Sequence, residues 1–308
     1  MFKCSQICEG HIRVKHTDRF KMKDLGKLRH FLGIDFNQGD NCVRMSQSKY
    51  VGKILDRFNM QDCKPRSTPC EQKLDYTDGA EKMTDVRKYR EAVGSLIYLN
   101  ICTRPDISFV VSKLAQYFTE PTVEQWATVK HVLRYLRGTI DKELYYRKCN
   151  ETLGINAYSD ADWAASNDRR STTGYCVSLT KCGALISWKT KKQPTVALST
   201  CEAEYIALAT TIQECLYLKQ LLENLDKCQY SPPRVYEDNQ GTIALAKNPV
   251  SRQRCKHVDI KYHFIRSTVN NGTVMLEYCP TNEMVADILT KPATKNKLIK
   301  FAAFIFGR

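Results

Sequence analysis

Residues 153–190 read LGINAYSDADWAASNDRRSTTGYCVSLTKCGALISWKT. Three short segments of this stretch, 153–163, 173–180 and 184–190, are rich in aromatic and branched residues. Polar and glycine-containing turns separate them. Segments of this composition joined by such turns favour strands. The stretch therefore predicts a three-stranded antiparallel meander.

The chain after residue 190 alternates between predicted helices and strands. A long helix is predicted over residues 199–225, where apolar residues at helical spacing form one stripe. It is followed by a strand over 234–238, a short helix after Asn239, a basic helix over 254–269, a strand over 273–278 and a final helix over 282–291. Together with the meander, this order predicts an α/β fold in which helices flank a mixed five-stranded sheet.

The residues before 150 follow a different pattern. Residues 31–36 and 43–45 favour two strands around the turn-prone QGDN, and a helix is predicted over 46–58. A polar connector over 63–85 leads to a helical region over 87–137, in which Pro105 and Pro121 suit helix starts and Gly138 suits a helix end. We therefore predict three regions: a short hairpin and helix in 1–70, a mainly helical region in 71–150 and the α/β domain in 151–308.

The last helix of the helical region carries a basic stripe. Lys130, Arg134 and Arg137 follow one another at three-to-four spacing, which places them on one face. Such a stripe is usually a solvated face, but beside a nucleic-acid site it could follow a phosphate backbone. The spacing leaves both interpretations open.

The charge balance favours a polyanionic partner. The chain of 308 residues has a formal net charge of +14, and basic residues exceed acidic ones in both halves. Lysine and arginine neutralise phosphates and release counterions, so an excess of this size favours nucleic acid over a purely solubilising role. With 43% hydrophobic residues, the chain is also able to bury real cores.

Cysteine usage and the chain ends indicate an intracellular protein. The 14 cysteines show no CxxC pair and no zinc-finger spacing, so we expect them to be reduced and mostly buried. The first residues lack the apolar core of a secretory signal, and no stretch reaches the ~20 apolar residues of a membrane span. We expect neither secretion nor a membrane contact.

Four acids in the C-terminal half suggest a metal site. Asp160, Glu204, Asp238 and Asp287 each lie in a different local motif, beside a predicted strand end or on a helix. Magnesium prefers oxygen ligands and takes few from the protein, so acids from separate elements must converge to hold a pair of ions. The alternative is that these acids cap helices or form surface salt bridges.

Several strings of the chain resemble a known family. YSDADWA, RRSTTGYC, STCEAEY, EDNQGTIALAKNP, KHVDIKYHFIR and VADILTKP, in this order, resemble the ribonuclease H domain of copia-type (Pseudoviridae) retrotransposon Pol polyproteins. Upstream, MKDLGKLRHFLGI, SQSKYVGKIL, CKPRSTP and YREAVGSLIYLNICTRPDISFVVSKLAQY resemble the end of the reverse transcriptase palm, its thumb and its connection. The resemblance extends from about residue 20 over nearly the whole chain.

The resemblance implies a ribonuclease H-like fold and an activity. It assigns the four catalytic and metal-binding acids to Asp160, Glu204, Asp238 and Asp287, and it does not select Asp162 or Glu202. Two Mg²⁺ ions, for which Mn²⁺ can substitute, would then support hydrolysis of the RNA strand of an RNA/DNA hybrid. The polymerase acids of the family lie in a YVDD string, which this sequence lacks, so we expect no DNA synthesis from this chain alone.

Further residues are candidates for substrate contacts. Arginine and hydroxyl side chains bind phosphates, and amides contact the sugar edge of RNA. Histidine can titrate near neutral pH, but a packing role is equally open for it. The loop YCPTNE before the last acid lacks the histidine that many ribonuclease H domains carry there. The candidates are Arg169, Arg170, Ser171, Thr172, Asn239, Gln240, His257 and His263.

Three classes of function follow. The first is an active ribonuclease H, and the second is a non-catalytic nucleic-acid-binding remnant of a retrotransposon Pol protein. An integrase-related or structural fragment is the third, which is disfavoured because integrases of this fold use a different acid triad. Partners would be an RNA/DNA hybrid and the rest of a Pol polyprotein or a second chain. The expected location is the cytoplasm, in a virus-like particle, or the nucleus.

Overall fold

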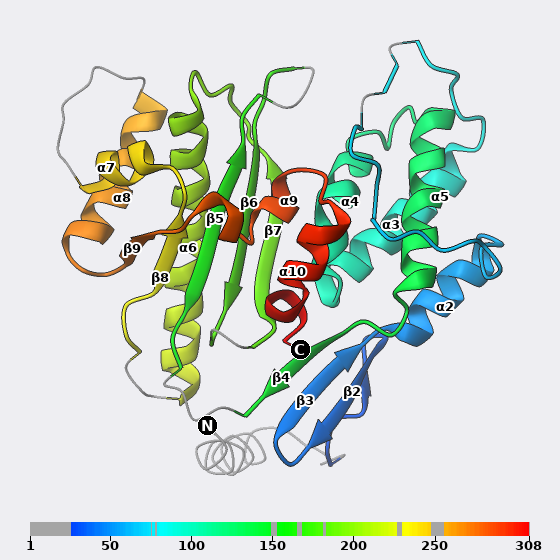
Figure 1. Cartoon of the computed structure of the whole chain (residues 1–308), viewed down its shortest axis with the longest axis horizontal. Helices are drawn as coiled ribbons and strands as arrows, with labels where there is room; N and C mark the ends of the chain where they lie inside the picture. Colours follow the sequence, from blue (N-terminus) through cyan, green and yellow to red (C-terminus); the bar gives the residue numbers. More distant parts are fainter. Residues whose placement is uncertain are drawn as a thin grey trace, which may run out of the picture.

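A computed structural model gives the fold of the chain. It describes residues 26–74, 76–77, 79–148, 153–164, 168–180, 183–226, 230–247 and 256–307, with the backbone alone at 226 and 256–260. What the sequence predicts for residues 1–25 lies outside this part of the chain. Figure 1 shows a helical half, a larger sheet with its own helices, and a smaller sheet beside the C-terminal helix.

The five-stranded sheet confirms the predicted fold class. Its strands are β5 (Asn156–Asp162), β6 (Thr172–Ser178), β7 (Leu185–Lys192), β8 (Arg234–Glu237) and β9 (Met275–Tyr278), in the order β7-β6-β5-β8-β9. β7, β6 and β5 form the predicted antiparallel meander, whereas β8 and β9 run parallel to β5. The sheet is therefore mixed, as the ribonuclease H resemblance implies (Figure 1).

Helices cover both faces of this sheet. α6 (Thr200–Asp226) packs against β5 and β6, with α7 (Gln240–Lys247) and α8 (Lys256–Asn270) against α6. α9 (Asp287–Thr290) lies on the opposite face of β5 and β6, and α10 (Lys295–Phe306) packs between β7 and β4 (Figure 1). Successive β6 residues alternate between these layers: Tyr175 and Val177 join the core under α6, and Cys176 joins the core under α9 and α10.

The single helix predicted over residues 282–291 is wrong. A 3₁₀ turn (Thr281–Glu283) is followed by an extended residue, Met284, and then by the four-residue α9. Met284, Val285 and Ala286 are all buried, which one amphipathic helix lying on a sheet could not achieve. The last helix is α10, a segment that the sequence pattern did not assign to a helix.

A second, smaller sheet contains the predicted hairpin. β2 (Ile34–Gly39) and β3 (Cys42–Ser46) form the hairpin, and β1 (His30–Phe31) adds to its outer edge. β4 (Glu143–Arg147) pairs antiparallel with β3 over its whole length. The sequence pattern missed β1 and β4; β4 finds its partner about a hundred residues earlier in the chain, a pairing that local periodicity does not encode.

The helical half contains the predicted helices. They are α2 (Ser48–Arg57), α3 (Val86–Cys102), a 3₁₀ turn at Pro105–Ile107, α4 (Ser108–Ala115) and α5 (Val123–Gly138). Asp85 accepts a hydrogen bond from Lys88 N–H and so caps α3. Thr122 and Gln125 form a capping box at the start of α5. The starts of α3 and α5 are therefore each fixed by a side chain that satisfies an otherwise unpaired helix N–H.

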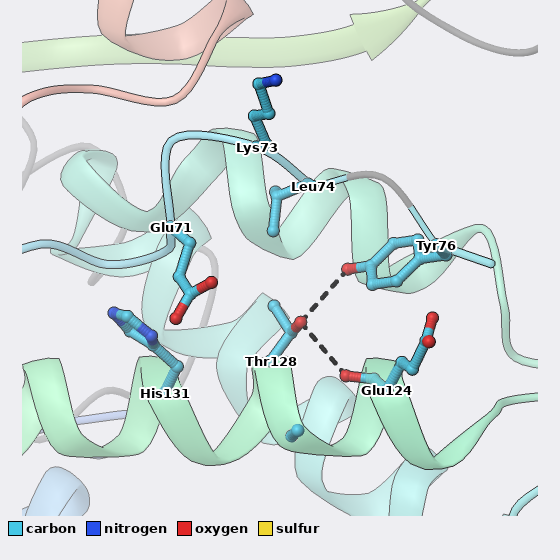
Figure 2. Close-up of a pocket in the computed structure, with 8 residues that line it drawn as sticks. Glu71, Lys73, Leu74, Tyr76, Glu124, Thr128 and His131 are labelled. Carbon is cyan, nitrogen blue, oxygen red and sulfur yellow. Dashed lines mark hydrogen bonds between the residues drawn. The ribbon is translucent and has the colours of Figure 1, made fainter.

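The basic stripe of α5 holds the connector in place. Arg134 donates a 2.7 Å hydrogen bond to the carbonyl of Lys64, and Arg137 donates one of the same length to the carbonyl of Gln61. The ring of His131 lies 3.0 Å from the carbonyl of Thr68. A pocket of about 290 Å³ lies between the connector and α5 (Figure 2). At one end of this pocket the hydroxyl of Tyr76 donates a hydrogen bond to the hydroxyl of Thr128. Arg134 and Arg137 of the stripe thus have a structural role.

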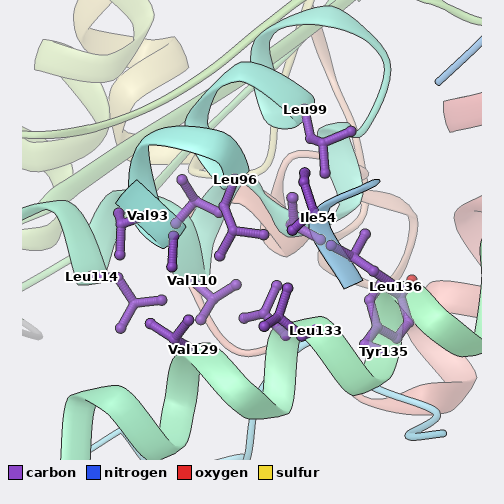
Figure 3. Close-up of a cluster of buried hydrophobic side chains, with 14 of the residues drawn as sticks. Ile54, Val93, Leu96, Leu99, Val110, Leu114, Val129, Leu133, Tyr135 and Leu136 are labelled. Carbon is purple, nitrogen blue, oxygen red and sulfur yellow. The ribbon is translucent and has the colours of Figure 1, made fainter. Parts of the chain in front are cut away.

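An apolar core joins α2 to α3, α4 and α5. Figure 3 shows how side chains from these four helices interdigitate. Ile54 of α2 lies in the same cluster as Leu99 of α3, Val110 of α4 and Leu136 of α5. Residues on both sides of the predicted boundary at 70/71 therefore share one core, and the domain boundaries stay predictions.

A buried ion pair lies at one end of this core. The guanidinium of Arg104 contacts the carboxylate of Asp106 at 2.9 Å, and each side chain is only 1% exposed. The hydroxyl of Tyr135 donates to the same carboxylate, and Arg104 also donates to Thr139. Burial alone would raise the pKa of Asp106, but Arg104 and Lys142 hold that pKa well below its usual value.

The two halves meet along β7. The indole N–H of Trp188 donates to the carbonyl of Asn100, at the end of α3. The hydroxyl of Thr190 bonds both to the Ser108 hydroxyl of α4 and to the Leu289 carbonyl of α9. α4 therefore covers the edge of the five-stranded sheet, next to α9.

Gly174 sets how closely α9 approaches the sheet. It lies on β6 directly opposite Asp160 of β5. A Cβ atom at this position would lie 2.6 Å from Cγ2 of Thr290 and 3.0 Å from Cβ of Leu289. Only glycine therefore allows α9 to lie against the strand at this distance.

We predict that Asp106→Asn lowers the free energy of unfolding by about 3–5 kcal/mol, because it leaves the Arg104 charge buried without a counter-charge. Urea unfolding followed by circular dichroism measures the change. Glu120→Gln removes the exposed pair with Lys82 and serves as the control, with a cost below about 1 kcal/mol. Equal costs for the two variants would contradict the buried role of Asp106.

We predict that Gly174→Ala lowers the free energy of unfolding by about 1–3 kcal/mol, since the new methyl group overlaps α9. The matched control is Gly94→Ala in α3, where a Cβ meets nothing within 4 Å. That substitution should raise stability by about 0.5–1 kcal/mol, because alanine is the better helix former. Thermal unfolding of both variants tests the opposite signs.

Candidate metal centre

Three of the four predicted acids converge at one edge of the five-stranded sheet. Asp160 is in β5, and Asp238 directly follows β8. Because β5 and β8 are parallel neighbours, their carboxyl ends lie at the same edge. Glu204, near the start of α6, reaches this edge as well. One carboxylate oxygen from each of Asp160, Glu204 and Asp238 lies within 4.8 Å of the others.

The start of α6 explains why Glu204 rather than Glu202 reaches the cluster. The hydroxyl of Ser199 accepts a hydrogen bond from the N–H of Glu202, and the carboxylate of Glu202 accepts one from the N–H of Leu198. Glu202 thus serves the helix start, as in a capping box. Glu204 is 7% exposed and accepts a hydrogen bond from the backbone of Ala161, in β5.

Asp287 lies beside the three-acid cluster without belonging to it. It is 1% exposed on α9 and forms ion pairs with Lys291, at 2.6 Å, and with Lys297 of α10. Thr290, on the same short helix, donates a hydrogen bond to Asp160. α9 therefore carries both Asp287 and Thr290, and the hydroxyl of Thr290 contacts Asp160. The ammonium groups of Lys291 and Lys297 balance the negative charge of Asp287.

The cluster is electrostatically strained when it holds only carboxylates. Burial and the nearby charge of Asp287 raise the pKa of Asp160 to about 7. Burial, followed by the charges of Glu237, Asp160 and Asp238, raises the pKa of Glu204 well above its ordinary value. Carboxylates held close together in a buried site favour either protonation or the binding of a cation in place of the protons.

Glu237 is a fifth acid that the sequence motifs did not indicate. It is fully buried, and its pKa lies well above the ordinary value because of burial. One of its oxygens accepts a hydrogen bond from the N–H of Asn239, next to Asp238. The signal was present in the strand RVYE: Val235 faces the core, so strand alternation places Glu237 on the same inward side.

The donor set fits a hard divalent cation. Carboxylate oxygens are the ligands that Mg²⁺ prefers, and a cation with several waters needs few of them. Within the part of the chain that the structure describes, one buried oxygen of Glu204 and one of Glu237 have no hydrogen-bond partner. Buried acceptors left in this way indicate a ligand for the cluster.

The turn before β6 carries two exposed and two buried candidates. Arg169 and Arg170 are exposed, and Arg170 lies 3.6 Å from Asp168. Ser171 is fully buried, and its hydroxyl accepts a hydrogen bond from the N–H of Ala164. Thr172 is buried as well. The predicted phosphate contacts of Ser171 and Thr172 conflict with this burial, because neither hydroxyl faces solvent.

The candidates after β8 are also divided. The side chain of Asn239 accepts a hydrogen bond from Thr242 N–H and so caps α7, whereas Gln240 is exposed. His263 is exposed on α8, and no contact joins it to the acids in the described structure. The side chain of His257 lies outside the described residues.

No helix in the described ranges combines the length and the apolar character that a membrane crossing requires.

Comparison with known proteins relates this chain to retrotransposon proteins. The reverse transcriptase (RNA-dependent DNA polymerase) family matches residues 5–72. The chain is 41% identical over 292 residues to the retrovirus-related Pol polyprotein from transposon RE1 of Arabidopsis thaliana, and this match covers 94% of the chain and 20% of the relative. It is 45% identical over 199 residues to the uncharacterized mitochondrial protein AtMg00810 of the same plant, covering 64% of the chain and 81% of that protein.

A solved structure with a similar fold is ribonuclease H1 from the halophilic archaeon Halobacterium salinarum. The similarity covers 44% of this chain and 93% of that one, with 15% identity and a TM-score of 0.33. The fold assignment itself comes from the strand order and directions of the five-stranded sheet.

The sequence matches extend over nearly the whole chain, and the chain spans about a fifth of the length of the Pol polyprotein that it matches. The order of its parts, a reverse transcriptase end followed by an α/β domain with strand order β7-β6-β5-β8-β9, agrees with that relationship. The chain therefore belongs to the copia-type retrotransposon Pol polyprotein family, as the part that joins the end of the reverse transcriptase to a ribonuclease H-like domain.

Proposed function

We propose that this chain is a ribonuclease H, which hydrolyses the RNA strand of an RNA/DNA hybrid with the help of two Mg²⁺ ions. The observation that carries this proposal is the convergence of Asp160, Glu204 and Asp238 within 4.8 Å. Asp160 and Glu204 are buried and Asp238 is partly buried, and one oxygen of Glu204 has no hydrogen-bond partner within the described residues. Acids gathered in this way are unfavourable for stability alone and favourable for holding a divalent cation.

The proposed roles follow from the positions of the acids. Asp160, Glu204 and Asp238 hold the first ion, and Asp287 completes a second position beside Asp160. Divalent ions held by these residues would supply the activation of water and the stabilisation of the leaving 3′-oxygen that hydrolysis requires. Thr290 orients Asp160 through its hydrogen bond, and Gly174 keeps α9 close enough for that bond to form.

Substrate recognition involves exposed groups around the cluster. Arg169 and Arg170 are free of the core and suit phosphate oxygens of the hybrid. Gln240 is exposed two residues after Asp238 and suits a contact to the 2′-hydroxyl that distinguishes RNA from DNA. The net charge of +14 adds attraction for any nucleic acid. The rest of the Pol polyprotein, or a second chain, would supply further contacts.

We predict that Asp238→Asn lowers hybrid cleavage by about 100-fold or more, because the loss of one charged ligand costs about 3 kcal/mol of transition-state stabilisation. Release of fragments from a labelled RNA/DNA hybrid measures the rate. Glu202→Gln changes an acid in the first turn of α6 whose carboxylate accepts a hydrogen bond from Leu198 N–H, and it should stay within about threefold of the parent. Omission of Mg²⁺ should abolish cleavage by every variant.

The same assay separates the proposed enzyme from a non-catalytic nucleic-acid-binding remnant. A remnant would bind the hybrid in a salt-dependent manner and release no fragments at any Mg²⁺ concentration. Binding without turnover by well-folded protein would therefore remove the enzymatic proposal and keep the binding one.

We predict that Mg²⁺ raises the melting temperature more at about pH 8 than at about pH 5.5, by roughly 3 °C or more. The pKa of Asp160 is raised to about 7 from 3.8, so its contribution to stability is complete below 3.8 and is lost as the pH rises toward 7. A cation compensates for that loss only where the acids are deprotonated. Thermal unfolding at both pH values, with and without Mg²⁺, measures the difference.

Asp160→Asn is the control for this pH effect, since it removes the carboxylate with the raised pKa. An equal Mg²⁺ effect at both pH values in the parent protein would contradict the proposed link between the cluster and the cation.

A further inference from the structure

Asp287 differs from the other three acids in its partners. Asp160, Glu204 and Asp238 face one another, whereas Asp287 is 1% exposed and forms ion pairs with two ammonium groups. The two lysines come from different elements. Lys291 directly follows α9, and Lys297 lies in the first turns of α10.

The position of Lys291 makes it more than a partner of one acid. It is 40% exposed, so its ammonium group lies at the border between the cluster and solvent. The charges of Asp160 and Asp162 act on it in addition to that of Asp287. Lys291 therefore places a positive charge that acts on Asp160 as well as on Asp287.

The packing of α10 determines how Lys297 approaches Asp287. The side chains of Leu298, Phe301 and Ile305 bury one face of α10 in the core between β4 and α9. Thr294 caps this helix through Lys297 N–H. The helix thus directs Lys297 toward Asp287, and both partners are held by separately packed elements.

Two ammonium groups at Asp287 oppose a divalent cation there. Like charges repel at short range, and the low polarity of a buried site strengthens the effect. A cation between Asp160, Glu204 and Asp238 meets less of this repulsion, because in the described structure both lysines form their ion pairs with Asp287, and of the two only Lys291 acts on Asp160 at a distance.

We propose that Lys291 and Lys297 form a lysine lock on Asp287 that makes the two metal positions unequal. The free protein binds one divalent ion at Asp160, Glu204 and Asp238. The second ion binds at Asp287 once the two ammonium groups turn to phosphate oxygens of a nucleic-acid backbone. This inference rests on the proposed function, and it makes the two lysines substrate-contacting residues that couple substrate binding to metal loading.

The alternative is that the lysines only stabilise a buried carboxylate. Both explanations predict that lysine variants lose stability, so stability alone does not separate them. They differ in ion binding, because a purely structural pair leaves the affinity for a second ion unchanged when one lysine is removed.

The test counts Mn²⁺ ions bound to the full chain by electron paramagnetic resonance of free Mn²⁺. We expect the parent protein to bind one ion at least about tenfold more tightly than a second. Lys291→Met and Lys297→Met should each tighten the second ion by about tenfold, and Lys295→Met, an exposed residue of α10, should change neither. Asp287→Asn should lose the second ion and keep the first.

A hybrid with a 2′-O-methylated RNA strand, which lacks the free 2′-hydroxyl, serves as the backbone probe. It should tighten the second ion in the parent protein and have a smaller effect in Lys291→Met. Should Lys291→Met fail to fold, as judged by circular dichroism, Lys297→Met decides, because Lys291 stays paired with Asp287 in that variant.

The outcomes separate this inference from the proposed function. Two equal ions in the parent protein, or lysine variants with an unchanged second ion, would overturn the lysine lock while hybrid cleavage stands. A parent protein that binds no Mn²⁺ would overturn both.

Discussion

The repulsion between buried carboxylates is the constraint on which this half of the molecule depends. Asp160, Glu204, Asp238 and the unexpected Glu237 are all brought to one sheet edge, where burial and the charges of Glu237, Asp160 and Asp238 raise the pKa of Glu204. The fold tolerates this because parallel β5 and β8, the long helix α6 and the tightly packed α9 are held by large apolar cores on both faces of the sheet. Burial of apolar side chains in these cores offsets the free-energy cost of placing the acids together.

The helical half contributes to this rigidity. α4 lies along β7, and hydroxyl and indole hydrogen bonds connect it and α3 to the strand. Thr190 bonds both to Ser108 of α4 and to Leu289 of α9, so one side chain ties the helical half to the short helix that carries Asp287. The buried pair of Arg104 and Asp106 lies close by in sequence, in the turn between α3 and α4. The helical half therefore adds support to the short helix that carries Asp287.

The sequence predicted those features that depend on local pattern. The meander, the long helix and the helices α3, α4 and α5 follow from periodicity and turn residues, and the acids follow from family strings. Other features depend on tertiary contacts. The burial of Ser171, the split of the last predicted helix at Met284 and the two lysines on Asp287 arise from packing between distant segments, which no local spacing encodes. Glu237 was not indicated by the family strings, but the alternation of side chains along β8 is sufficient to predict that it points into the core.

β4 carries a consequence for how the polypeptide is assembled. Its five residues cover the outer side of β3, although the ribosome makes them about a hundred residues later. Until then the hairpin exposes a row of unpaired backbone groups, which is a template for strands from other molecules. A protein fragment that ends before Glu143 retains this open edge permanently, so self-association and aggregation are the outcomes to expect when copies of this transposon sequence are interrupted there.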